Sequence, residues 1–128
     1  MARRTKGQRE YMERLQDPRW QRKRLGVLER AGWKCEGCGT GEVNLQVHHG
    51  WYERDAMPWE YPDEALYCLC DHCHEKAETR KVEAYRELGL IAPWHQAYAV
   101  SLLRDLQRLL ADGASAEMLD TATVERVG

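Results

Sequence analysis

Residues 35–38 read Cys-Glu-Gly-Cys and residues 70–74 read Cys-Asp-His-Cys-His, which gives two Cys-x2-Cys pairs separated by 31 residues. Four thiolates at about 2.3 Å around a tetrahedral ion are the ligand set of a structural zinc site. The first pair contains a glycine, which relieves strain where the backbone turns toward sulfur. The sequence therefore predicts one structural Zn²⁺ ion, bound by Cys35, Cys38, Cys70 and Cys73.

Two other uses of the cysteines compete with zinc. Disulfides are one, but paired Cys-x2-Cys motifs in a chain without a secretion signal are more typical of metal or redox chemistry. Residues 70–74 also match the covalent haem signature, but haem attachment would leave the first cysteine pair without a role. A fifth cysteine, Cys68, lies in an apolar run and is most simply a small buried hydrophobic residue. Zinc is the interpretation that employs both pairs.

The composition is that of one small domain. The 128 residues are 43% hydrophobic and 31% charged, and five Trp and six Tyr stand in a chain without Phe. No stretch has the 18 or so apolar residues that a membrane span needs, and the first residues are polar rather than an apolar signal core. We therefore expect a soluble cytoplasmic protein with one modest core and no membrane partner.

Charge is distributed unevenly along the chain. Residues 1–30 contain ten Lys and Arg against four Asp and Glu, whereas the other 98 residues contain nine against seventeen. A cationic segment on an acidic body is one way to hold a phosphate backbone. A solvated helix that is simply basic is the alternative, and charge alone does not separate the two.

The chain around the cysteine pairs divides into short elements. Asp17 and Pro18 form a helix start, because Asp caps free amides and Pro lacks the donor that a first turn leaves unused. Residues 94–111 carry apolar side chains at helical spacing, which predicts a helix packed on the core, with a partner or membrane surface as the alternative. The expected order is a basic arm over 1–16, a helix from Pro18 to Gly32, strands at 44–48 and 66–69 around an aromatic loop at 50–64, helices at 72–88 and 94–111, and a tail over 112–128.

Three histidines and a glutamate are candidates for chemistry. His48 and His49 are adjacent on an expected strand, so their side chains point to opposite faces and can do different work. His74 and Glu78 are four residues apart on an expected helix, which places them on one face at ligand spacing. A satisfied core histidine, and a solvated Glu78 paired with Lys81, are the structural alternatives.

These motifs together resemble the zinc-stapled branch of the HNH endonucleases. The resemblance rests on a Cys-x2-Cys pair, His48-His49 on a strand, an aromatic loop, and Leu-x2-Leu-Cys-x2-Cys-His leading into a helix, and it covers residues 33–78. It implies an α+β fold with a small ββα-metal core at 33–88, stapled by the four-cysteine zinc site and flanked by N- and C-terminal helices within a domain at 17–111. The combination is specific, although each part alone is common.

The resemblance also implies a role for each candidate. His48, His74 and Glu78 would be ligands of a catalytic metal, and His49 would be the general base that takes a proton from the attacking water. The family usually has His or Asn where this chain has Glu78, and an oxygen ligand favours Mg²⁺ or Mn²⁺. Basic side chains expected at the nucleic acid are Arg54, for which a solvated loop arginine is the alternative, and Arg22, Lys23 and Arg24.

One position departs from the family pattern. The Asn or Asp that normally precedes the leucine of the second strand falls on Ala65, whose methyl group cannot make the hydrogen bonds that fix the loop and orient the base. Asp63 or Glu64 would have to replace it through a shifted loop. This departure motivates a second hypothesis beside catalysis.

The leading functional hypothesis is an HNH-like endonuclease that hydrolyses DNA phosphodiester bonds with one divalent ion. The second is a zinc-stapled nucleic-acid-binding module with weakened catalysis, and the third is a purely structural or protein-interaction zinc domain. DNA is the expected partner, and phages, mobile elements and defence loci are the settings in which similar proteins are met.

Overall fold

The structure is a computed structural model that describes residues 2–115 and residue 117. It divides into two compact units, one ending at Arg80 and one beginning at Lys81, which are described separately. The first unit contains both cysteine pairs and all the candidate histidines. Most of the tail expected over 112–128 lies outside the described residues.

Two helices open the first unit. Helix α1 spans Lys6–Leu15, and the hydroxyl of Thr5 caps it by accepting a hydrogen bond from the Gln8 amide. Helix α2 spans Pro18–Arg30, and the Asp17 carboxylate accepts the Arg19 amide at 2.8 Å. The predicted helix start is thus confirmed, because Asp17 satisfies a free amide and Pro18 needs no donor. The basic arm expected over 1–16 is itself mostly helical.

A two-stranded antiparallel sheet carries the candidate histidines. Strand β1 spans Leu45–His49 and strand β2 spans Leu66–Cys70, and they pair in a register that sets His48 opposite Tyr67 and His49 opposite Leu66. Strand β1 ends one residue later than the sequence predicts, so His49 is part of the sheet. The aromatic loop between the strands contains two 3-10 turns, Pro58–Glu60 and Asp63–Ala65.

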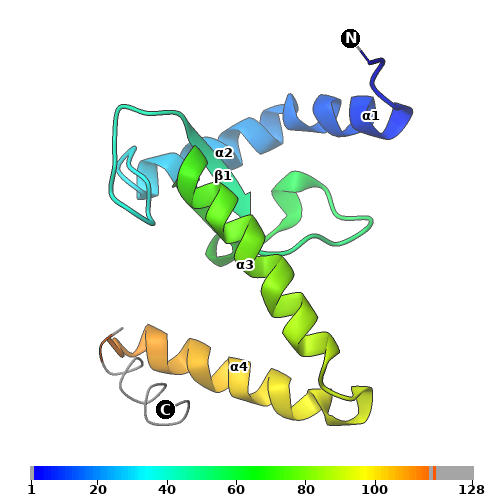
Figure 1. The fold of residues 1–128 in the computed structure, drawn as a ribbon. Helices are drawn as coiled ribbons and strands as arrows, with labels where there is room; N and C mark the ends of the chain where they lie inside the picture. Colours follow the sequence, from blue (N-terminus) through cyan, green and yellow to red (C-terminus); the bar gives the residue numbers. More distant parts are fainter. Residues whose placement is uncertain (1, 116, 118–128) are drawn as a thin grey trace. The chain divides into compact units, whose positions relative to one another are not determined.

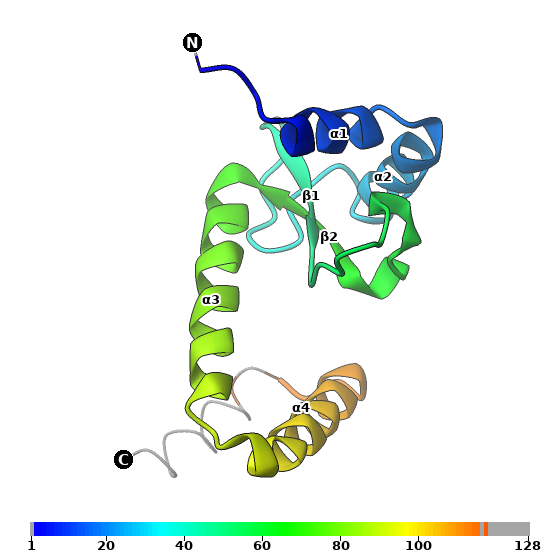
Figure 2. The same ribbon diagram turned by 90° about the vertical axis from the view of Figure 1, so that its right-hand side faces the viewer.

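Helices lie against both faces of the sheet (Figures 1 and 2), although Tyr67 of β2 stays exposed. Figures 1 and 2 show α2 on one face of the hairpin and the beginning of α3 on the other. Helix α3, Asp71–Gly89, continues from the last residue of β2 without a connecting loop. The core between α2 and the sheet consists of the buried side chains of Trp20, Val27, Leu28, Tyr61, Leu66 and Cys68. Cys68 is fully buried, which confirms its interpretation as a core residue.

The second unit contains the remainder of α3, a 3-10 turn at Pro93–His95 and helix α4 at Gln96–Ala111. The predicted helix at 94–111 is therefore present, but none of its side chains is buried. Its packing on the domain core stays a prediction. No helix in the described ranges is long and apolar enough to cross a bilayer.

Candidate functional site

The four predicted zinc ligands lie together. The sulfur atoms of Cys35, Cys38, Cys70 and Cys73 are all within 4.8 Å of one another. Four ligands about 2.3 Å from a tetrahedral ion lie about 3.8 Å apart, and the sulfurs of Cys38 and Cys70 are separated by 3.8 Å. The four cysteines could therefore bind a metal such as zinc, as the sequence predicts.

Local geometry explains how the first cysteine pair forms its turn. The Cys35 amide donates to Thr40 O at 2.9 Å, and the Gly39 amide donates back to Cys35 O at 2.8 Å. A Cβ atom at Gly37 would come within 3.1 Å of the Cys73 sulfur, closer than side chains normally approach. The absence of a side chain at Gly37 therefore suits the close approach of the two cysteine pairs.

The second pair sits where β2 becomes α3. Cys70 is the last residue of the strand and Cys73 lies in the first turn of the helix. The Cys73 amide donates to the Cys70 sulfur at 3.4 Å, which holds this sulfur over the start of the helix. Around Cys35, burial opposes ionisation, but backbone amides near the sulfur outweigh it and lower the pKa of this thiol to about 6. A thiolate is the form that binds metal.

A partly exposed ion pair joins the first cysteine turn to α2 and β2. Oε1 of Glu36 accepts Arg30 Nη2 at 2.8 Å and the Cys68 amide at 2.9 Å. The Arg30 guanidinium also donates to the carbonyl oxygens of Asp63 and Leu66, at 3.0 and 2.6 Å. Burial by itself would raise the pKa of Glu36. The hydrogen bond from the Cys68 amide and the charge of Arg30 outweigh burial and lower this pKa below its usual value. The network fixes the cysteine turn against the sheet.

Removing the Glu36 charge tests this network. We expect Glu36→Gln to lower the free energy of unfolding by about 1–3 kcal/mol, because charge-assisted hydrogen bonds to Arg30 and to an amide are weakened. Glu29→Gln on exposed α2 surface is the matched control. Urea unfolding followed by tryptophan fluorescence measures both variants, and equal midpoints would show that the network contributes nothing.

The second group of ligands lies on the α3 side of the sheet. Nδ1 of His48 is 3.1 Å from Oε1 of Glu78, Nε2 of His74 is 3.7 Å from the same oxygen, and the three residues offer ligand atoms within 4.8 Å of one another. The two imidazole rings meet edge to face at 5.4 Å. His48 is 6% exposed, so its ring is largely removed from water. The three residues could hold a metal ion.

His49 faces the other way, as adjacent strand residues must. Its ring stacks on Trp20 at 5.1 Å and meets Tyr61 edge to face at 4.9 Å. Nε2 lies 3.1 Å from Pro58 O. A carbonyl oxygen only accepts hydrogen bonds, so this contact places the proton on Nε2 and makes Nδ1 the basic nitrogen of the neutral ring.

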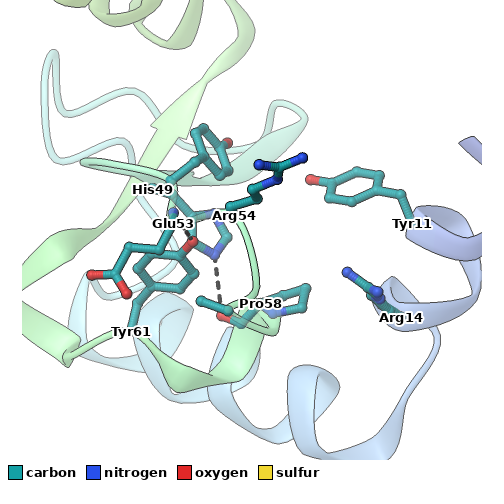
Figure 3. Close-up of a pocket in the computed structure, with 9 residues that line it drawn as sticks. Tyr11, Arg14, His49, Glu53, Arg54, Pro58 and Tyr61 are labelled. Atoms are coloured by element: carbon teal, nitrogen blue, oxygen red, sulfur yellow. Dashed lines mark hydrogen bonds between the residues drawn. The ribbon is translucent and has the colours of Figure 1, made fainter. Parts of the chain in front are cut away.

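A cavity of about 160 Å³ opens beside His49 and is shown in Figure 3. Two of its walls come from segments far apart in the sequence, namely α1 and the loop that follows β1. Tyr11 and Arg14 project from α1, while Arg54 projects from the loop toward them. The lining residues are Tyr11, Arg14, His49, Tyr52, Glu53, Arg54, Ala56, Pro58 and Tyr61.

Tyr52 connects this cavity with the His48 side of the sheet. Its ring lies 5.3 Å from that of His49. Burial raises the pKa of Tyr52 to about 12, and the negative charge of Glu78 adds to the rise. Tyr52 is thus within electrostatic range of Glu78 while it touches His49.

The predicted cationic residues are in different situations. Lys23 forms an ion pair with Asp63 at 2.9 Å, and Arg22 and Lys23 line a separate hollow on α2. Arg24 is half-buried on the same helix. Of these four predicted cations, Arg54 alone lies at the cavity beside His49. Arg14, which also lines the cavity, was not predicted from the sequence, although its place on the basic arm was the available signal.

The loop between β1 and β2 is held in place although Ala65 has no side chain that can form hydrogen bonds. The backbone oxygen of Ala65 accepts the Gly50 amide at 2.7 Å, and the hydroxyl of Tyr61 accepts the Glu53 amide at 2.8 Å. Asp63, a suggested replacement for the absent Asn, is paired with Lys23 instead. The Ala65 carbonyl and the Tyr61 hydroxyl therefore hold the second half of the loop to the residues that follow β1.

Comparisons with family models, curated proteins and solved structures found no significant match.

Proposed function

We propose that the protein is a metal-dependent endonuclease of the HNH type that hydrolyses phosphodiester bonds in DNA. The observation that carries the proposal is the placement of two imidazoles and a carboxylate, His48, His74 and Glu78, within 4.8 Å of one another, with His49 on the adjoining strand position. The motif resemblance described above supports the same assignment.

The donor set suits a divalent cation. Two neutral imidazole nitrogens and one carboxylate oxygen form a mixed ligand set, and the carboxylate of Glu78 shifts its preference toward Mg²⁺ or Mn²⁺. An ion bound there would supply electrostatic stabilisation of the charge that develops on the phosphate oxygens. His48 and His74 would hold that ion from the strand and from the helix, respectively.

His49 would act as the general base. With its Nε2 proton donated to Pro58 O, its Nδ1 is the nitrogen that can accept a proton from an attacking water. Stacking on Trp20 and contact with Tyr61 hold the ring in one orientation. These contacts supply the orientation that Ala65 cannot, which favours catalysis over the weakened binding module.

The direct test is nicking of supercoiled plasmid with Mg²⁺, Mn²⁺, Ni²⁺ and Zn²⁺ in turn. We expect cleavage with at least one of these ions and at least about a hundredfold loss in Glu78→Ala, since one of three ligands is removed. Glu75→Ala, one turn from Glu78 on the same helix and exposed, is the matched control.

The outcome also separates the alternatives. Salt-sensitive DNA binding without cleavage under any ion would replace the endonuclease with the nucleic-acid-binding module. Neither binding nor cleavage would leave a structural zinc domain. Full activity in Glu78→Ala would contradict the proposed ligand set.

A further inference from the structure

We propose that the cavity beside His49 is a phosphodiester-binding subsite in which Arg14 of α1 and Arg54 of the loop hold one backbone phosphate of a nucleic acid. The inference rests on the proposed function, because it takes the same nucleic acid as ligand. It goes further by giving the N-terminal helix a defined place in the site.

The size of the cavity matches a small group rather than a whole nucleoside. Pockets for drug-sized ligands are typically about 300–1,000 Å³, whereas this cavity measures about 160 Å³. It can admit one phosphate group with its ester oxygens more readily than a base and sugar together. An extended chain would lie across the opening and place one phosphate inside.

The chemistry of the lining suits an anion. Guanidinium groups are always charged and bind phosphate oxygens through two parallel hydrogen bonds. Figure 3 shows Arg14 and Arg54 entering from opposite sides, with the Tyr11 hydroxyl directed at Arg54. The cavity also has an acidic lining residue, Glu53. Its carboxylate accepts a hydrogen bond from the Trp51 indole N–H at 3.0 Å and points away from both arginines.

The two cations at the cavity are uncommitted. Within the described ranges, neither Arg14 nor Arg54 forms an ion pair. Three other cations of the first unit are held in ion pairs instead: Arg19 with Asp17, Lys23 with Asp63 and Arg30 with Glu36. Because Arg14 and Arg54 both line one small cavity and neither is held in an ion pair, their charges act together on an anion that enters it.

The test is DNA binding by Arg14→Ala, with Arg9→Ala as the matched control. Arg9 is an exposed arginine on the same helix that does not line the cavity. Fluorescence anisotropy of a short labelled DNA duplex, without added divalent ion, measures affinity over a range of NaCl concentrations. We expect Arg14→Ala to weaken binding about tenfold and to lower the slope of log affinity against log salt by about 1. Arg54→Ala should do the same, and Arg9→Ala should stay within about twofold of wild type.

Several results would overturn the subsite. Wild-type affinity in Arg14→Ala would do so, and so would an equal loss in Arg9→Ala, since that would indicate a diffuse charge effect. Displacement of the duplex by micromolar inorganic phosphate would assign the cavity to a free anion. Circular dichroism and zinc content of Arg14→Ala confirm that the variant is folded.

The subsite and the proposed function can fail separately. Binding that depends on Arg14, without cleavage under any ion, would remove the endonuclease and keep the subsite. Cleavage and binding at wild-type levels in Arg14→Ala would keep the endonuclease and remove the subsite.

Discussion

Replacing Cys70 by Ala is expected to abolish stoichiometric zinc binding and to unfold the first unit at room temperature. The first unit has only a small core, and a structural zinc site contributes about 10–16 kcal/mol of binding energy that is also folding energy. Cys70 and Cys73 lie where β2 becomes α3, so loss of the Cys70 ligand would release the turn that contains Cys35 and Cys38 from this junction. Elemental analysis of zinc and the thermal unfolding transition measure the effect.

Cys68→Ala is the control for that variant. Cys68 lies two residues before Cys70 and is fully buried, but it is not among the four clustered cysteines. We expect one zinc per chain and a loss of about 1 kcal/mol, which is the cost of a small cavity in the core. A folded Cys70→Ala protein that retains one zinc would disprove the assignment of Cys70 as a zinc ligand. Zinc loss in Cys68→Ala would show that the ligand set is different.

Replacing His49 by Ala is expected to lower the rate of plasmid nicking by about 10²–10⁴-fold, the usual contribution of a general base. His49 is only 3% exposed and packs on Trp20, so the variant also loses core contacts. His49→Gln fills more of that space without a basic ring nitrogen and should lose the same activity. Thermal unfolding and DNA binding, measured on both variants, separate loss of chemistry from loss of structure.

His72→Ala is the matched control for the histidine variants. His72 lies inside the second cysteine pair but is exposed and belongs to neither ligand group. Its nicking rate should stay within about twofold of wild type, as for other exposed substitutions. Nicking by His49→Gln at the wild-type rate would remove His49 as the base.

Much of the local structure could be predicted from the sequence. Asp17 and Pro18 indicated a helix start, alternation around Val47 indicated β1, and the paired cysteines indicated a cluster that the structure bears out. Such features depend on a few adjacent residues, so the relevant physics is visible in a short window. The convergence of His48 with His74 and Glu78 was also expected, although the family resemblance was needed to predict it.

The contacts of the loop could not be predicted in this way. The bonds from His49 to Pro58 O and from the Glu53 amide to Tyr61 join residues whose spacing follows no helical or strand period. Arg14 was missed for a related reason, because its position depends on how α1 folds back on the loop. Sequence patterns specify elements well and their tertiary neighbours poorly.

The register of the hairpin has a consequence of its own. Each strand residue is committed to one face, so sliding β1 by a single position against β2 would exchange the surroundings of His48 and His49. His48, which now lies beside Glu78, would then face Trp20. His49, which now lies beside Pro58, would face α3. An insertion or deletion within β1 is therefore expected to be far more damaging than any single substitution there, because it would displace both imidazoles at once.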